Sequence, residues 1–169
     1  SMACNASKIA ISNAGIKNKD IELVIFSTLS PDYFFPGSGV ILQDMMNLGT
    51  CPALDIRNQC SGFIYGLSVA DQFIKTGMYK NILLVGSENQ SGGLDLTTRG
   101  RATSVIFGDG AGAVVLNREN DLKKGIMSTH LYSQGKFAKE LSVIGPSTKK
   151  WIHEIFRDYN ENDPKYHPY

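Results

Sequence analysis

The sequence has no apolar run long enough to cross a membrane and no apolar segment of the secretory type. It also lacks an excess of charge of either sign, since 17 Lys and Arg balance 16 Asp and Glu. No basic cluster alternates with aromatic residues, so nothing indicates a nucleic-acid-binding surface. The three cysteines are an odd number without regular spacing, which argues against a disulfide framework and fits a reducing compartment. These absences predict a soluble, cytoplasmic protein.

Histidine is scarce as well, with only His130, His153 and His167. None of them stands at metal-ligand spacing from a cysteine or a carboxylate, so we expect no metal site. None has a sequence context that pairs it with a cysteine as a general base. His130 falls on a predicted strand and reads as a structural residue.

Apolar segments of strand type alternate with segments of helical type over the first half of the chain. Helices are expected over residues 3–14, 40–48 and 62–77, and buried strands over residues 21–26, 52–56 and 81–87. Alternation of this kind predicts an α/β protein with a parallel sheet and helices on its faces.

The pattern changes after residue 87. Residues 88–101 are polar and rich in glycine, which predicts a surface loop. Further strands are predicted over residues 102–107, 113–117 and 125–132.

A glycine-rich segment surrounds Gly108, Gly110 and Gly112. It lacks the Gly-Lys-Ser/Thr ending of a phosphate-binding loop and the glycine spacing of a dinucleotide fingerprint. We therefore interpret it as a tight turn between two closely packed strands.

The C-terminal part has little capacity to form a core. Three prolines and many charges follow residue 145, and only a short amphipathic helix near residues 151–159 is expected. We predict one domain over residues 1–145 and a polar connecting segment over residues 146–169.

Cys60 is the candidate nucleophile, because it lies where the predicted strand 52–56 gives way to the predicted helix starting at Gly62. The free N–H groups at the start of a helix favour a negative charge, and thiolate is the nucleophilic form of cysteine. A buried structural cysteine is an equal alternative from the residues alone. Cys4 and Cys51 lack this context, so we interpret both as structural.

Three motifs then place the chain near a known family: Asn58-Gln59-Cys60-Ser61-Gly62-Phe63, Thr98-Arg99-Gly100-Arg101-Ala102-Thr103 and Phe107-Gly108-Asp109-Gly110-Ala111-Gly112-Ala113. In order and spacing they resemble β-ketoacyl-[acyl-carrier-protein] synthase III, a condensing enzyme of the thiolase fold. The resemblance covers nearly all of residues 2–135. It implies the N-terminal half of a thiolase-like fold, with a mixed, mostly parallel sheet and helices on both faces.

The resemblance implies a role for three residues. Cys60 matches the nucleophile that takes an acyl group from acyl-CoA, with its own backbone N–H as one half of the oxyanion hole. Phe35 matches a phenylalanine that closes the acyl pocket of the partner in a homodimer. Arg101 matches an arginine near the CoA adenine, and Arg99 is the alternative for that role.

The implied activity is the initiating condensation of fatty-acid synthesis, an acyltransferase reaction. Acyl-CoA and malonyl-ACP (malonyl-acyl carrier protein) are then the substrates, with loss of CO2 and without a cofactor or metal. An enzyme of secondary metabolism that loads another starter on the same cysteine is a second possibility. A non-catalytic half-domain used for interaction is a third.

The chain also departs from the family. Members are about twice as long, within the range of two-domain chains. Their second half carries a catalytic His and Asn without counterparts here, and their first strand is missing. The sequence therefore predicts an internal fragment covering most of the N-terminal half, which alone would be inactive in condensation.

Overall fold

The computed structural model describes residues 1–121 and 123–142 of the chain. Its contacts divide the chain into two units, residues 1–130 and residues 131–169. The strands and α-helices of the described residues all belong to the first unit. The described part of the second unit contains a 3-10 turn, Gly135–Phe137. The boundary predicted at residue 145 and the helix predicted near residues 151–159 lie outside the described residues.

A four-stranded sheet forms the centre of the first unit, in the order β2-β1-β3-β4. Its strands are β1 (Leu23–Ser27), β2 (Ala53–Ile56), β3 (Asn81–Glu88) and β4 (Gly110–Asn117). The first three strands are parallel, and β4 pairs antiparallel to β3. The predicted mixed, mostly parallel sheet is confirmed.

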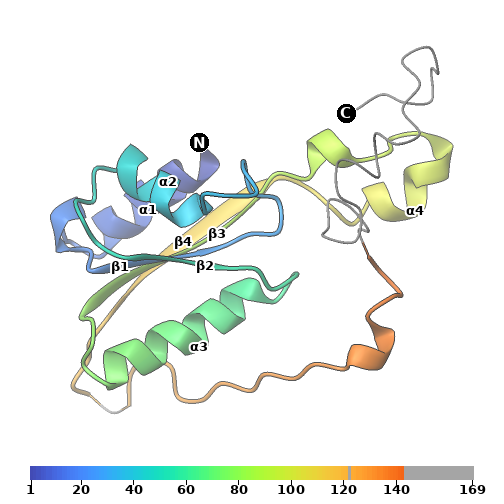
Figure 1. The fold of residues 1–169 in the computed structure, drawn as a ribbon. Coiled ribbons are helices and arrows are strands. Elements are labelled where there is room, and N and C mark those ends of the chain that lie inside the picture. The colour runs from blue at the N-terminus through green and yellow to red at the C-terminus, as the bar shows by residue number, and fades with distance from the viewer. Residues whose placement is uncertain (122, 143–169) are drawn as a thin grey trace. The chain divides into compact units, whose positions relative to one another are not determined.

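Helices cover both faces of this sheet, as predicted (Figure 1). α1 (Met2–Asn13) and α2 (Ser38–Met45) lie on one face, and α3 (Gly62–Lys75) lies on the other. Gly15 and Gly77 follow α1 and α3 with φ of +67° and +77°, the left-handed conformation that ends helices. No helix among the described residues is long and apolar enough to span a membrane.

The inner strands β1 and β3 carry the core. Every residue of β1 is buried, and so are four consecutive residues of β3, which confirms the prediction from their apolar runs. Alternate side chains pack against α1 and α2 on one side and against α3 on the other. A Cβ on Gly66 of α3 would lie 2.5 Å from Leu84 Cδ1, so this glycine lets the helix approach the sheet closely.

The strand predicted over residues 52–56 is present as β2, but the prediction that it is buried is wrong. β2 is an edge strand whose one neighbour is β1, and Leu54 is 38% exposed. The Asp55 carboxylate accepts hydrogen bonds from the N–H groups of Ser38 at 2.6 Å and Gly39 at 2.8 Å. β2 therefore caps the start of α2 as well as leading toward Cys60.

Two predictions around the glycine-rich segment are also wrong. The short helix α4 (Arg101–Ser104) and an exposed turn replace the strand predicted over residues 102–107. Both sides of β3 are already paired, to β1 and β4, so no place remains for a further strand beside it. The segment itself is the beginning of β4 rather than a turn, because Gly110 and Gly112 pair with Glu88 and Gly86.

The strand predicted over residues 125–132 does not form either. These residues run without ladder partners, and Met127 is 70% exposed. Within this stretch, Thr129 lies beside α3 instead, with its Oγ1 3.4 Å from Ser68 Oγ.

Candidate active site at the start of helix α3

Cys60 lies in the turn between β2 and α3, at the position that the sequence indicates. Its φ of +55° is in the left-handed region, which costs an L-residue about 1–2 kcal/mol. Asn58 Nδ2 donates a hydrogen bond to Ser61 Oγ at 2.9 Å across the turn. This geometry leaves the Cys60 side chain exposed at the N-terminal end of a 14-residue helix.

Gly62 explains how the helix can start so close to the sheet. A Cβ at this position would overlap the Ser27 hydroxyl at the end of β1. With any other residue here, either the Ser27 hydroxyl would have to turn away or the first turn of α3, with Cys60, would have to move from the strand ends. The glycine thus sets the distance between the thiol and the carboxyl ends of the strands.

A cleft of about 320 Å³ opens beside Cys60. It lies where β1 and β3 end and β4 begins, and ligands of α/β proteins bind outside the carboxyl ends of parallel strands. Besides Cys60, its lining consists of Ser27, Leu29, Asn58, Gly62, Phe63, Gly86, Ser87, Glu88, Gln90, residues 106–108 and residues 110–112. A Cβ on Gly110 or Gly112 would meet no atom within 4 Å. At these two positions the cleft is therefore lined by backbone atoms, with unfilled space in front of them.

Asp109 ties the glycine-rich wall to the loop after β3. Its carboxylate accepts hydrogen bonds from the backbone N–H groups of Gln90 at 2.7 Å and Ser91 at 2.8 Å, and from the Ser91 hydroxyl at 2.6 Å. The Ser91 hydroxyl and these N–H groups hold the pKa of Asp109 below its ordinary value. The charged form of Asp109 therefore braces one rim of the cleft.

The other two cysteines are placed differently. Cys4 is buried between α1 and α2, with its Sγ 3.9 Å from Met45 Sδ. Cys51 is half-buried, and burial raises the pKa of its thiol. Of the three, Cys60 alone is exposed.

Comparisons with known proteins give the family of this chain. Residues 54–135 match the family model of 3-oxoacyl-[acyl-carrier-protein (ACP)] synthase III. A beta-ketoacyl-[acyl-carrier-protein] synthase III of Aliivibrio fischeri is 46% identical over 165 residues, which are 92% of this chain and 51% of the relative. This chain belongs to the β-ketoacyl-[acyl-carrier-protein] synthase III family. It spans about half the length of the curated relatives that it matches.

Solved structures of the synthase III family share the fold. The enzyme of Aquifex aeolicus VF5 has a TM-score of 0.67 at 42% identity, covering 71% of this chain and 38% of that chain. The enzyme of Pseudomonas aeruginosa PAO1 has a TM-score of 0.78 at 29% identity, covering 88% of this chain and 46% of that chain. The predicted half of a thiolase-like fold is confirmed.

Phe35 does not line the Cys60 cleft. It lies in the loop between β1 and α2, where three consecutive aromatic residues, Tyr33, Phe34 and Phe35, are 61%, 73% and 83% exposed. The loop ends at the start of α2, which Asp55 holds.

Arg101 and Arg99 differ in what they contact. The Arg99 Nε donates to Asp95 Oδ2 at 2.6 Å, and the Thr97 hydroxyl, together with Arg99, lowers the pKa of Asp95 to about 2. Arg101 begins α4 and is exposed. No ion pair or hydrogen bond to another described residue engages its guanidinium.

The histidines do not meet Cys60 in the described residues. His130 is exposed, with Nε2 3.2 Å from Ser128 Oγ, and does not line the cleft. His153 and His167 lie outside the described residues. Residues 1–121 and 123–142 hold no cluster of three His, Cys, Asp or Glu side chains suited to a metal.

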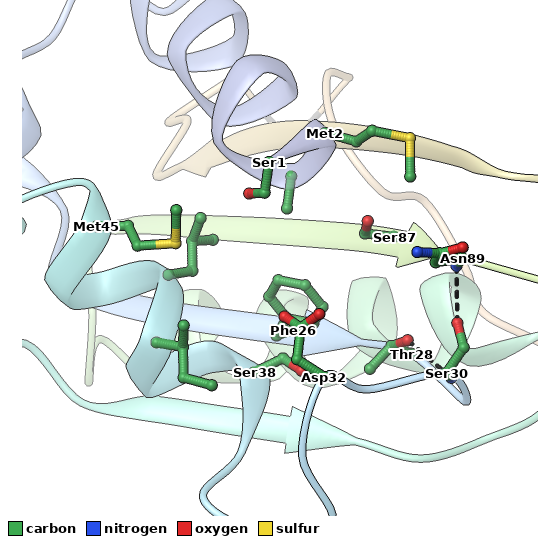
Figure 2. Close-up of a pocket in the computed structure, with 13 residues that line it drawn as sticks. Ser1, Met2, Phe26, Thr28, Ser30, Asp32, Ser38, Met45, Ser87 and Asn89 are labelled. Atoms are coloured by element: carbon green, nitrogen blue, oxygen red, sulfur yellow. Dashed lines mark hydrogen bonds between the residues drawn. The ribbon is translucent and has the colours of Figure 1, made fainter. Parts of the chain in front are cut away.

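Sequence reasoning missed the cleft residues Ser27, Leu29 and Glu88. It also missed Asp109, which braces the rim without lining the cleft. All of them stand at the ends or beginnings of strands, which is a signal that the parallel-sheet prediction could have used. A second cavity of about 290 Å³ lies on the α1 and α2 side of the same strand ends, lined by Thr28, Ser30, Ser87 and Asn89 among others (Figure 2).

Proposed function

We propose that this chain provides the nucleophile of an initiating condensing enzyme of fatty-acid synthesis. The observation that carries the proposal is an exposed Cys60 in a cleft at the start of α3, within a chain 46% identical to a named synthase III. The Cys60 thiolate would attack the thioester carbonyl of acyl-CoA. A new sulfur–carbon bond forms, the bond to CoA breaks, and the CoA thiolate leaves and takes up a proton.

The oxyanion of that step would be stabilised by the backbone N–H of Cys60. This N–H donates no hydrogen bond to the described residues, whereas the N–H of Ser61 is already donated to the Gln59 carbonyl. An unpaired N–H beside the attacking sulfur supports the oxyanion role. A single donor of this kind typically contributes about a hundredfold or more in rate.

Condensation is the second step of the proposal. The enzyme would join the acyl group on Cys60 to malonyl-ACP with loss of CO2, and the enolate that forms needs polar donors. We propose that a His and an Asn of a second half supply them, since this chain spans half the length of its relatives. The 169 residues alone would then acylate slowly and would not condense.

We further propose that Arg101 contacts the CoA adenine region and that Phe35 closes the cleft of a partner subunit in a homodimer. The guanidinium of Arg101, which no other described residue engages, supports the first role, because Arg99 is engaged by Asp95. The exposed aromatic residues around Phe35, which leave the cleft of their own chain open, support the second. Light scattering on wild type and Phe35→Ala tests the dimer, and a monomeric wild type at micromolar concentration would remove this role.

Two other functions remain distinguishable by experiment. The half-length match favours a non-catalytic half-domain, which would carry no acyl group on Cys60. An enzyme of secondary metabolism would load Cys60 but prefer a starter other than acetyl-CoA.

The test uses radiolabelled acetyl-CoA and malonyl-ACP with the full-length protein. Wild type should carry label on Cys60, and Cys60→Ser should lose it, because a hydroxyl without an adjacent base is a far poorer nucleophile. Cys51→Ser is the matched control and should keep the label. Label retained by Cys60→Ser, or acetoacetyl-ACP formed at a normal rate by the 169 residues alone, would contradict the proposal.

A further inference from the structure

Glu88 is the most heavily hydrogen-bonded carboxylate among the described side chains. It is the last residue of β3 and lines the Cys60 cleft. Its Oε1 accepts from the Leu29 N–H at 2.9 Å, and its Oε2 from the Ser30 N–H at 3.1 Å and the Thr28 hydroxyl at 3.2 Å. The Ser30 hydroxyl and the Gln90 side-chain amide also donate to Oε2.

These bonds continue the sheet beyond the point where its backbone pairing ends. The last residue of β1 that pairs with β3 is Ser27, opposite Gly86. The N–H of Thr28 still donates to the Ile56 carbonyl at the end of β2, at 3.3 Å, but those of Leu29 and Ser30 have no backbone partner among the described residues. The Glu88 side chain accepts both, so it replaces the missing ladder bonds.

A second set of bonds locks the same segment from the other side. The Ser30 hydroxyl also accepts from the Asn89 N–H at 2.8 Å, which Figure 2 draws as a dashed line. The Ser30 N–H is shared with the Thr28 hydroxyl at 3.1 Å. Residues 28–30 are therefore fixed by Glu88 and its neighbour, and not by packing alone.

Only one residue of this fixed segment enters the Cys60 cleft. Leu29 lines it together with Ser27, whereas Thr28 and Ser30 line the second cavity on the opposite side of the strand ends (Figure 2). The side chain of Leu29 is half-buried, and its backbone is held by the bond from its N–H to Glu88. The position of this cleft wall depends on the Glu88 carboxylate.

We propose that Glu88 is a positioning residue for acyl transfer: by holding residues 28–30 it places Leu29 and limits the size of the acyl group that fits beside Cys60. Glu88 need not touch the reacting atoms for this role. The inference rests on the proposed acyl transfer to Cys60. Amide exchange tests the hold of Glu88 on residues 28–30 without acyl transfer, and the acyl-chain preference tests its effect on the reaction.

The central variant is Glu88→Gln. An amide has one carbonyl oxygen, so an N–H₂ group would face one of the donors that the carboxylate now accepts. We expect the amide protons of Leu29 and Ser30 to exchange with solvent at least about tenfold faster, which requires no acyl transfer. We also expect the ratio of kcat/KM for hexanoyl-CoA over acetyl-CoA to rise by roughly tenfold, because a looser wall discriminates less.

Glu22→Gln is the matched control. Glu22 accepts the Lys80 N–H at the opposite end of the same two strands, far along the sheet from the cleft. It should leave both the exchange of residues 29 and 30 and the acyl-chain ratio within about twofold of wild type. Alkylation of Cys60 should keep its wild-type rate in both variants. If Glu88→Gln does not fold, Ser30→Ala removes two bonds of the same set and is read by the same measurements.

The outcomes are separable. Faster exchange with an unchanged acyl-chain ratio would overturn the positioning role, and so would a changed ratio that Glu22→Gln reproduces. Unchanged exchange would show that Glu88 does not hold the segment, and would overturn the inference as well. A wild type that takes no acyl group from either CoA thioester would overturn the proposed function and this role with it, while the exchange result would stand on its own.

Discussion

Two helices cover one face of the sheet and a single helix covers the other, and the two faces are packed differently. On the α1 and α2 face, small and branched residues such as Ala3, Cys4, Ala10 and Ile11 are buried. On the α3 face, Gly62, Gly66 and Ala70 are the buried residues of the helix, and its larger apolar side chains are half-buried or exposed.

The difference in packing between the two faces explains on which face the exposed cysteine lies. On the α1 and α2 face, side-chain packing buries Cys4 and half-buries Cys51, and the cavity of about 290 Å³ on this side is lined by neither. The α3 face uses glycines to bring a helix start against the strand ends, at the cost of a left-handed residue in the preceding turn. The more open face therefore carries the exposed thiol and the cleft.

The largest expected effect compares the cysteines of the two faces. Cys60 should react with iodoacetamide roughly tenfold or more faster than Cys4 or Cys51 at neutral pH, because it is exposed at a helix start. Cys4 is sealed, and burial raises the pKa of Cys51, which keeps that thiol protonated. Mass-spectrometric mapping of a limited reaction on the folded protein measures all three rates at once. Equal labelling of Cys4 would show that α1 and α2 do not bury this thiol as described.

How much of these two faces the sequence predicts depends on whether the interacting residues lie close together along the chain. The presence of α1, α2 and α3, the buried runs of β1 and β3 and the turn at Cys60 follow from local spacing, and all were predicted, although the ends of α2 were not. The exposure of β2 was not predicted, because its position at the sheet edge depends on which strands pair, and pairing is set by contacts distant in sequence. The prediction of a turn at the glycine-rich start of β4 was wrong for the same reason. Glycines indicate a turn unless their strand partners, here Gly86 and Glu88, are known.

The site shows the same limit. The motif around Cys60 identified the nucleophile candidate, but nothing in the spacing of Glu88 and Leu29, 59 positions apart, indicates that they are bonded. Asp109 and Ser91 were likewise paired only by the fold. Residues that position a wall of the cleft are recognised by their hydrogen-bond partners, and those partners are known only from the structure.

A second experiment tests the close approach of α3 to the sheet. Gly66→Ala places a methyl group against Leu84, which is fully buried and has little room to move. Overpacking should lower the free energy of unfolding by about 1–3 kcal/mol, although alanine is the better helix former. Urea denaturation measures the change.

Gly92→Ala is the control for Gly66→Ala, because a Cβ there meets nothing within 4 Å. Its free energy of unfolding should stay within about 0.5 kcal/mol of wild type. A Gly66→Ala protein as stable as Gly92→Ala would mean that α3 can shift away from the sheet, and the contrast between the two faces would lose its basis.

The smallest expected effect concerns the rim of the cleft on the α3 face. The pKa of Asp109 is lowered in the folded protein, chiefly by the Ser91 hydroxyl. Its bonds therefore add stability above the pKa of an unfolded aspartate, about 3.9, and this contribution is lost as pH falls through the lower folded value. Asp109→Asn should be slightly less stable than wild type at pH 6, and the difference should shrink below about pH 4.

The measurement is the difference between the urea midpoints of wild type and Asp109→Asn at each pH between 3 and 6. In this difference the pH-dependent contributions of the other carboxylates, which both proteins share, cancel. Ser91→Ala, made in both wild type and Asp109→Asn, separates the contribution of the hydrogen bond from that of the charge. Ser91 supplies the hydroxyl that donates to Asp109. Ser91→Ala should destabilise wild type more than it destabilises Asp109→Asn. A difference between wild type and Asp109→Asn that stays constant across this pH range would show that the Asp109 charge does not brace the rim, and that the cleft on this face is held by its backbone alone.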